Sequence, residues 1–194
     1  MHTHLAETLD EERFCIEAVG MRPLAYMESL DWLGPDVWYA HGIHFSDEEI
    51  KLLADTGTGV AHCPTSNQKL CSGRALLERL LEAGVPVGLG VDGSASNDCS
   101  NMLAEIRPAY LLHRLAMGNQ APTPVEILEL ATGGGARLIG RPDLGSIEEG
   151  KAADMFLVKA DTLEWVGADF DPASALATIG LYRPVDYTIV AGRI

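Results

Sequence analysis

The sequence predicts an α/β protein whose strands and helices form half of an eight-stranded parallel barrel, with a small β appendage at the carboxyl end. Two observations lead to this prediction. Short runs of β-branched and apolar residues alternate with longer helical patterns, as in strand–helix–strand units around a parallel sheet. Beyond residue 142 this alternation stops, and short strand patterns separated by turns replace it. We therefore expect a barrel part at residues 1–142 and a partial β-sandwich at residues 143–194.

The barrel part contains strand patterns that are each followed by helical patterns. The expected strands cover residues 1–5, 37–41, 59–62 and 85–91. The expected helices cover residues 9–19, 24–30, 47–54, 75–83, 102–115 and 123–139. Ser46 with Glu49, and Thr123 with Glu126, have the spacing of helix capping boxes, and Gly84 is placed to end a helix. Four strands, each followed by helices, make half of an eight-stranded barrel.

The appendage is predicted from a change in the sequence pattern that begins at Asp143. Residues 144–158 have the pattern of a turn, a strand, a second turn and an apolar strand. Residues 185–191 predict one more strand after a break at Pro184. We do not expect a further barrel unit here.

The composition excludes several classes of function. The chain has 194 residues, 47% of them hydrophobic, and a formal net charge of −14, which argues against nucleic acid as a partner. No apolar run approaches the ~20 residues that span a bilayer, and the first residues lack the pattern of a signal peptide. The 4 cysteines are scattered, so we expect them to be reduced and mostly buried. These features together predict a cytoplasmic protein that does not bind membranes.

Polar side chains follow every predicted strand. His4 and Glu7 follow the first strand, and His41, His62 and Asp92 follow the other three. In a parallel α/β barrel the active site lies at the carboxyl ends of the strands, so these side chains are expected to converge on one rim. A single histidine or aspartate at a strand end is more often structural, but five suitable groups together favour chemistry.

This set of side chains predicts a site for one divalent metal ion. Imidazole and carboxylate ligands suit Zn²⁺, with Fe²⁺ as the alternative, when one coordination position stays open for water. Glu7, three residues after His4, is placed to carry protons from the attacking water to a leaving nitrogen. His2 faces the same way as His4 on the strand, so the spacing alone leaves it open as a second ligand.

Motifs in the expected order relate the chain to a known family. They are HTHLAET at 2–8, AHGIHFSDEEI at 40–50, GTGVAHCPTSNQKL at 57–70 and VPVGLGVDGSASND at 85–98. With these motifs the chain resembles the amidohydrolase superfamily, in the branch of cytosine, guanine, S-adenosylhomocysteine and 8-oxoguanine deaminases and triazine hydrolases. The resemblance covers essentially the whole chain. It implies that the predicted strands are strands 5 to 8 of a (β/α)₈ TIM-type barrel.

The resemblance also implies a role for each candidate residue. His4 and Asp92 would bind the metal, and Asp92 would accept a proton from the attacking water. Glu7 would shuttle protons, and both carboxylates would contact the substrate. His41 would orient the water. This alignment places His4 on the fifth barrel strand and makes His2 a bystander.

The loop after the third expected strand has its own implied role. His62 would lie near the substrate, with Ser66 and Asn67 shaping the loop around it. In this segment His62-Cys63-Pro64 stands where the family pattern has His-Asn-Pro.

The substrate is implied by longer matches. The runs HTHLAETLDEE, LGPDVWYAHGIH and GVDGSASND look most like 8-oxoguanine deaminases and hydroxyatrazine ethylaminohydrolases. They imply hydrolytic removal of an exocyclic amine from a small purine-like ring. A triazine-type aminohydrolase and a non-catalytic chain that needs a partner half are the alternatives.

The chain also departs from the family pattern. Family members begin with a β-rich segment and a first barrel strand ending in H-x-H, which supplies two metal ligands, and this sequence contains neither. We therefore expect a fragment that lacks the amino-terminal half of the barrel and is inactive alone. Its open edges are expected to favour self-association into homo-oligomers.

Overall fold

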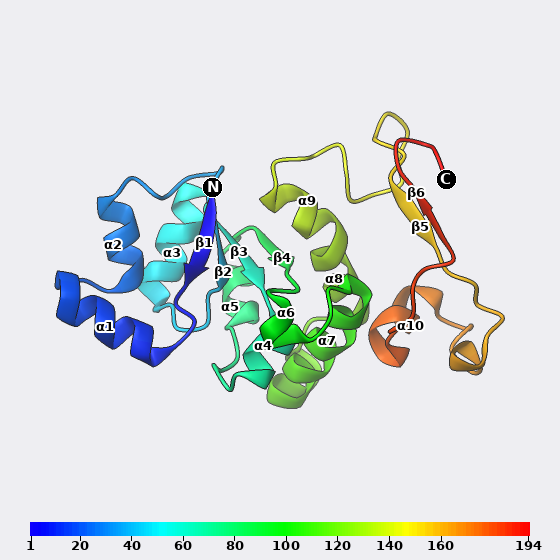
Figure 1. Cartoon of the computed structure of the whole chain (residues 1–194), viewed down its shortest axis with the longest axis horizontal. Coiled ribbons are helices and arrows are strands. Elements are labelled where there is room, and N and C mark those ends of the chain that lie inside the picture. The colour runs from blue at the N-terminus through cyan, green and yellow to red at the C-terminus, as the bar shows by residue number, and fades with distance from the viewer.

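A computed structural model describes all residues, 1–194. One sheet contains four parallel strands in chain order: β1 (His2–Leu5), β2 (Trp38–His41), β3 (Gly59–His62) and β4 (Val87–Leu89). Neighbouring strands are in register with His2 opposite Trp38, Ala40 opposite Ala61, and His62 opposite Leu89. Figure 1 shows the sheet with its helices at one end of an elongated molecule and the carboxyl-terminal segment at the other. The predicted α/β class with a parallel sheet is confirmed.

Helices connect the strands and cover the sheet. They are α1 (Leu9–Val19) and α2 (Pro23–Ser29) after β1, α3 (Asp47–Thr56) after β2, and α4 (Pro64–Lys69) and α5 (Leu77–Glu82) after β3. Ser46 and Glu49 form the predicted capping box at the start of α3. Gly57 ends α3 in the left-handed conformation. The short helix α4 was not predicted, because it begins at Pro64 without a capping side chain and has no apolar periodicity.

A second group of helices follows β4. It contains α6 (Ser94–Asn97), α7 (Met102–Met117), a 3₁₀ turn (Gly118–Gln120), and α8 (Pro124–Glu129) running through a π-turn (Leu130–Gly134) into α9 (Gly135–Leu138). The capping box of Thr123 and Glu126 at α8 is present as predicted. None of these helices combines the length and the apolar character that a membrane-spanning segment requires.

The core lies between the sheet and its helices, and β3 is buried along its whole length. Tyr39, Val60, Leu53 and Leu77 are among its fully buried side chains. On the other face of the sheet, α9 approaches β4 so closely that only glycine fits between them. A Cβ added to Gly88 would lie 2.9 Å from the backbone nitrogen of Gly135. Backbone therefore packs against backbone at this point.

The carboxyl-terminal segment is simpler than predicted. Strand β5 (Met155–Leu157) pairs antiparallel with β6 (Tyr187–Ile189). Between them lie a 3₁₀ turn (Leu163–Trp165) and α10 (Pro172–Ile179), which packs on α7 and α8. The strand predicted within 144–153 is wrong, because turns occupy this stretch and Gly145 and Gly150 have φ of 89° and 88°. A partial β-sandwich stays a prediction.

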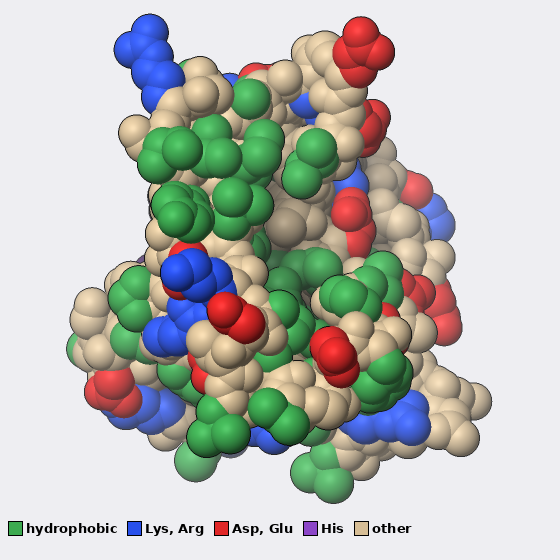
Figure 2. Space-filling model, turned by 90° about the vertical axis from the view of Figure 1, so that its right-hand side faces the viewer, with side chains coloured by type: hydrophobic (Ala, Val, Ile, Leu, Met, Phe, Trp, Pro, Cys, Tyr) green, Lys and Arg blue, Asp and Glu red, His purple; other side chains and the backbone are tan.

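This end of the molecule has apolar side chains on its surface. Figure 2 looks onto it and shows hydrophobic side chains gathered around a hollow. A groove of about 450 Å³ lies there between α7, α8 and the β5–β6 ribbon, lined by residues that include Ile106, Leu128, Phe156 and Tyr182.

The cysteines differ in part from the prediction. All four are free, as expected. Cys63 is buried, but Cys15 is half-buried and Cys71 and Cys99 are exposed, so the prediction that most are buried is wrong. Cys71 and Cys99 lie outside the helices and strands, in connecting segments. Such segments run over the surface of a protein.

Candidate metal centre

Left-handed backbone conformations occur at or shortly after the carboxyl ends of three strands of the sheet. Ala6 follows β1, His41 ends β2 and Asp92 follows β4, and their φ angles are 53°, 76° and 60°. Such conformations cost non-glycine residues about 1–3 kcal/mol each and persist only where the surroundings fix them. Here the carbonyl of Ala6 accepts hydrogen bonds from the backbone N–H groups of Ile43 and His44. The chain therefore turns sharply at the rim where the site residues lie.

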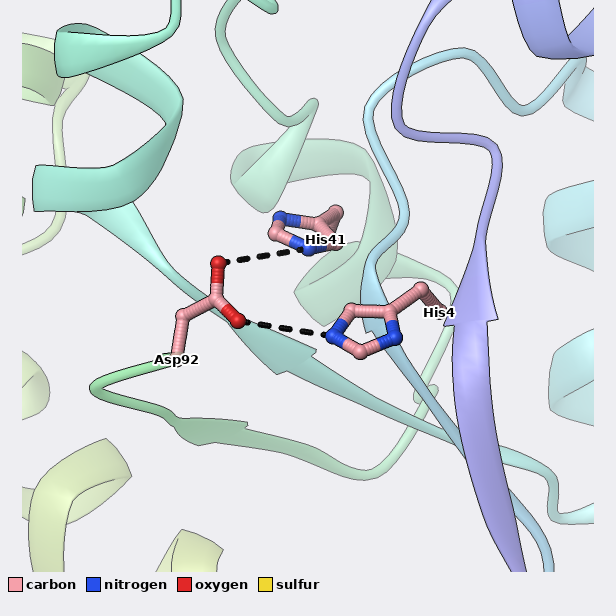
Figure 3. A group of neighbouring side chains, drawn as sticks. All are labelled: His4, His41 and Asp92. Carbon is pink, nitrogen blue, oxygen red and sulfur yellow. Dashed lines mark hydrogen bonds and ion pairs between the residues drawn. The ribbon is translucent and has the colours of Figure 1, made fainter. Parts of the chain in front are cut away.

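The structure brings His4, His41 and Asp92 together at this rim (Figure 3). Nε2 of His4 lies 3.4 Å from Oδ1 of Asp92, and Nε2 of His41 lies 3.7 Å from Oδ2 of the same carboxylate. The ligand atoms of all three residues lie within 4.8 Å of one another. Two zinc–ligand bonds of ~2.1 Å can bridge the 3.4 and 3.7 Å separations from Asp92. The roles of these residues as ligands or water-orienting groups stay predictions.

The carboxylate of Asp92 is held by hydroxyl groups. Its Oδ2 accepts hydrogen bonds from Ser66 at 2.6 Å and from Ser96 at 2.9 Å. Burial opposes ionisation of Asp92, but the hydrogen bonds from Ser66, the backbone of Gly93 and Ser96 outweigh it and lower the pKa to about 2. Asp92 is therefore a carboxylate near neutral pH.

Glu7 faces the same cluster from the loop after β1. Its Oε2 lies 3.5 Å from Nε2 of His41, and its Oε1 accepts a hydrogen bond of 3.2 Å from Ser72. The backbone N–H groups of Ala6 and Glu7 donate to the carboxylate of Glu11 at 2.9 and 2.8 Å. Hydrogen bonds with Ser72 and with Glu11 thus fix the loop that carries Glu7.

The side chain of His41 is buried, and only one of its two ring nitrogens has a hydrogen-bond partner in the protein. Its Nδ1 lies 2.8 Å from Oδ1 of Asn67, whereas its Nε2 has no hydrogen-bond partner in the protein. The unpartnered nitrogen faces the carboxylates of Glu7 and Asp92. Together with Nε2 of His4 and the carboxylate of Asp92, this nitrogen belongs to a donor set for a cation. The residues present therefore fit a divalent metal ion.

Comparison with known proteins decides the family. The model described as "Amidohydrolase family" matches residues 1–194. The chain belongs to the amidohydrolase family. This amidohydrolase chain is 52% identical over 192 residues to an 8-oxoguanine deaminase from Pseudomonas aeruginosa. The match covers 99% of this chain and 42% of that protein. It is 43% identical over 197 residues to a hydroxydechloroatrazine ethylaminohydrolase from Pseudomonas sp. strain ADP, covering 100% of this chain and 40% of that protein.

Solved structures agree with this assignment. The amidohydrolase chain matches the zinc complex of the atrazine chlorohydrolase TrzN from Arthrobacter aurescens TC1 with a TM-score of 0.93 and 38% identity. It also matches a zinc-bound adenosine deaminase from Xanthomonas campestris with a TM-score of 0.93 and 34% identity. Each match covers 99% of this chain, but 43% and 44% of the respective neighbour. The chain thus spans about two-fifths of the length of the relatives it matches.

His62 does not reach the cluster in this amidohydrolase chain. Successive side chains of a strand point to opposite faces, and Ala61 and Cys63 line the cavity beside the cluster, which leaves His62 on the other face. There His62 is fully buried, with its Nε2 3.1 Å from Nε2 of His113 in α7. The geometry supplies no contact between His62 and that cavity, so its predicted role near the substrate stays a prediction.

His62 and His113 form a neutral pair. Burial first, and then the neighbouring imidazole of His113, lower the pKa of His62 to about 3. Burial lowers the pKa of His113 to about 4, with a further contribution from Arg74. Sequence reasoning missed His113, because a histidine inside a helix carries no motif.

His2 lines the same cavity as His4 but points elsewhere. The cavity has a volume of about 480 Å³ and runs between the strands and α9. The ring of His2 stacks on Trp38, with ring centres 4.2 Å apart and planes 3° from parallel. His2 does not belong to the group of ligand atoms formed by His4, His41 and Asp92. The assignment of His2 as a bystander stays a prediction.

Proposed function

We propose that this chain supplies one half of the active site of a zinc-dependent hydrolytic deaminase whose substrate is 8-oxoguanine or a related oxidised purine. The observation that carries the proposal is the convergence of His4, His41 and Asp92 with Glu7 facing them. The identity of 52% with an 8-oxoguanine deaminase supports the choice of ring.

The residues divide the reaction between them. His4 and Asp92 would hold the metal ion, which when bound makes water nucleophilic near neutral pH. Asp92, ionised under these conditions, accepts a proton from the attacking water. Glu7 carries the other proton of the water to the exocyclic nitrogen as the bond from the ring carbon to nitrogen breaks, and the proton held by Asp92 passes to the ring nitrogen, so that ammonia leaves and a ring carbonyl remains. His41 orients the water through its unpartnered Nε2.

A triazine-type aminohydrolase is the second candidate. The identity of 43% with a hydroxydechloroatrazine ethylaminohydrolase favours it. Both reactions replace an amine on an electron-poor ring carbon with oxygen, so the same residues serve either ring. A third possibility is a non-catalytic chain that acts only with a partner half, since His4 and Asp92 supply two ligands and zinc takes four.

A chimera tests the proposal. In it these 194 residues replace the matched part of the Pseudomonas aeruginosa 8-oxoguanine deaminase. We expect the chimera to bind one zinc ion and to release ammonia from 8-oxoguanine faster than it releases amine from a hydroxytriazine. Elemental analysis and a coupled ammonia assay measure both quantities.

The outcome of the same assay separates the candidates. Faster turnover of the hydroxytriazine would replace the first candidate with the second. A folded, zinc-loaded chimera that turns over neither ring would contradict the assignment of a deaminase site to this chain.

A further inference from the structure

Glu105 is a buried acidic side chain in the first turn of α7, outside the group of ligand atoms. Its two carboxyl oxygens accept hydrogen bonds from different segments of the chain. Oε2 accepts from the backbone N–H of Thr65 at 3.1 Å, and Oε1 accepts from Nδ2 of Asn97 at 2.6 Å. These donors belong to two rim segments, residues 63–67 after β3 and residues 93–97 after β4. One carboxyl group therefore joins both segments.

Each of these two contacts lies one residue away from a hydroxyl group that holds Asp92. Ser66 directly follows Thr65 in the first rim segment. Ser96 directly precedes Asn97 in the second. Both hydroxyls donate to Oδ2 of Asp92, at 2.6 and 2.9 Å. The same oxygen is thus held from two segments that a single carboxyl group ties together.

We propose that Glu105 is a positioning residue that acts on Asp92 through the two rim segments. By fixing both segments it keeps Oδ2 of Asp92 against the serine hydroxyls. Oδ1 of Asp92 then stays turned toward His4, whose Nε2 lies 3.4 Å away. The proposal rests on the proposed function in taking His4 and Asp92 as metal ligands.

The first rim segment needs an acceptor from outside its own helix. Helix α4 begins at Pro64, and the residue before it, Cys63, makes no side-chain capping hydrogen bond. The first N–H groups of a helix have no partner within the helix. Glu105 supplies the acceptor for the N–H of Thr65. The start of the helix that carries Ser66 therefore depends on α7.

The second rim segment is tied to the backbone that leads into Asp92. Nδ2 of Asn97 donates to the carbonyl of Val91 at 2.6 Å as well as to Glu105. An amide nitrogen has two hydrogens, so both bonds can form. Val91 directly precedes Asp92, whose φ of 60° is held only where the surroundings fix it. The residue that Glu105 holds thus also fixes the entry to Asp92.

The two contacts require a carboxyl group at position 105. A carboxylate accepts at both oxygens, whereas a glutamine amide of the same shape presents one acceptor and one donor. The amide would face an N–H with an N–H at Thr65 or at Asn97, and a buried donor would lose its acceptor. Packing alone would be served by an apolar side chain, such as those of the buried neighbours Leu103 and Ile106.

Hydrogen exchange of the metal-free chain, followed residue by residue, tests the contact itself. We expect the N–H of Thr65 to exchange slowly in the unsubstituted chain. Glu105→Leu keeps the size but removes both acceptors, and it should speed this exchange by roughly 10-fold or more. Ile106→Val is the matched control, because it removes a buried methyl group from the same turn of α7 but no hydrogen bond to either rim segment. It should lower the urea midpoint and leave the exchange of Thr65 unchanged.

Zinc titration of the same proteins tests the effect on the site. Glu105→Leu should weaken zinc binding by roughly 10–100-fold, the usual effect of losing a group that orients a metal ligand. Glu105→Gln keeps one acceptor and should lie between Glu105→Leu and the unsubstituted chain. Ile106→Val should bind zinc as the unsubstituted chain does.

A double-mutant cycle separates positioning from general destabilisation. In a chain with Ser66→Ala and Ser96→Ala the hydroxyls that hold Asp92 are gone, so Glu105→Gln should weaken zinc binding less than it does alone. A role in stability alone predicts the same loss in both backgrounds.

Three results would overturn the proposal. They are exchange of the Thr65 N–H as fast as that of an exposed amide in the unsubstituted chain, unchanged zinc affinity in a folded variant at position 105, and equal losses in both backgrounds of the cycle. If Glu105→Leu does not fold, the exchange of the unsubstituted chain and the cycle with Glu105→Gln decide. The exchange needs neither metal nor substrate, so its outcome is distinct from failure of the chimera to turn over.

Discussion

At the scale of single residues, the site is prepared before any ligand binds. The strained conformations of Ala6, His41 and Asp92 are fixed by hydrogen bonds to their backbone or side chains rather than by a substrate. Glu7 in particular has one oxygen held by Ser72 and the other directed at His41. In the proposed reaction, these groups would need no change of rotamer to pass a proton.

The first prediction concerns Glu7. In the chimera, Glu7→Gln should lower turnover of 8-oxoguanine by roughly 10²–10⁴-fold, because the amide cannot carry a proton. Zinc content should stay near that of the unsubstituted chimera, since Glu7 is not in the group of ligand atoms. Ammonia release and elemental analysis measure the two effects. Loss of zinc would instead make Glu7 a ligand.

The second prediction concerns the pair of His62 and His113. Both pKa values are lowered in the folded chain from about 6.5 in the unfolded chain, so the unfolded chain binds more protons at acid pH. Stability should therefore be complete above pH ~6.5 and fall as the pH drops toward 4, by up to about 1.4 kcal/mol per pH unit for each histidine. Urea unfolding at several pH values measures this slope. An equal slope in a folded His113→Gln chain would rule out this pair as its origin.

At the scale of elements, the contact between β4 and α9 is the tightest in the barrel part. Gly88 and Gly134 face each other's backbone, and a Cβ on either would contact main-chain atoms that cannot rotate away. The neighbouring Gly59 is similarly closed off by Leu138. Glycine is required here for space rather than for an unusual φ angle.

The third prediction follows from that contact. Gly88→Ala should destabilise the chain by about 1–3 kcal/mol, because overpacking forces the backbone of β4 away from α9. Gly93→Ala is the matched control, since an added Cβ there meets nothing within 4 Å. Urea midpoints of the two variants give the comparison. Equal midpoints would show that α9 moves aside freely.

The elements also show what the sequence alone can predict. Strands such as Gly59–His62 were predictable, because a buried parallel strand is a continuous apolar run between turns. Helix α4 was not, since its polar segment from Pro64 to Lys69 is shaped by Glu105 from a distant helix. The convergence of His4, His41 and Asp92 followed from the strand-end rule, whereas the supporting contact of Asn67 with His41 depends on side-chain geometry that no spacing encodes.

At the scale of the whole molecule, the four-stranded sheet is open at both edges. Strands β1 and β4 each pair with a neighbour on one side only. Beside β1, the side chain of Phe14 is 72% exposed on α1. Unpaired strand edges and exposed apolar side chains both favour association.

The fourth prediction concerns these 194 residues expressed alone. They should bind zinc weakly, release no ammonia from 8-oxoguanine and self-associate, because two metal ligands, His4 and Asp92, and an open sheet leave the site incomplete. Elemental analysis, the ammonia assay and light scattering test the three parts. A monomer with stoichiometric zinc and rapid turnover would contradict this expectation and would bring His2 back as a ligand.

The glycine contact between β4 and α9 has a consequence for how ring preference can change in evolution or by design. Where Gly135 lines the cavity beside the cluster, the wall is main chain and offers no side chain to enlarge, shrink or recharge. Substitutions that alter the choice of ring must therefore act through side chains that line the same cavity, such as Trp38 and His2, whose rings stack. Libraries directed at those two positions should alter substrate preference, whereas libraries at Gly88 should mainly return unfolded chains.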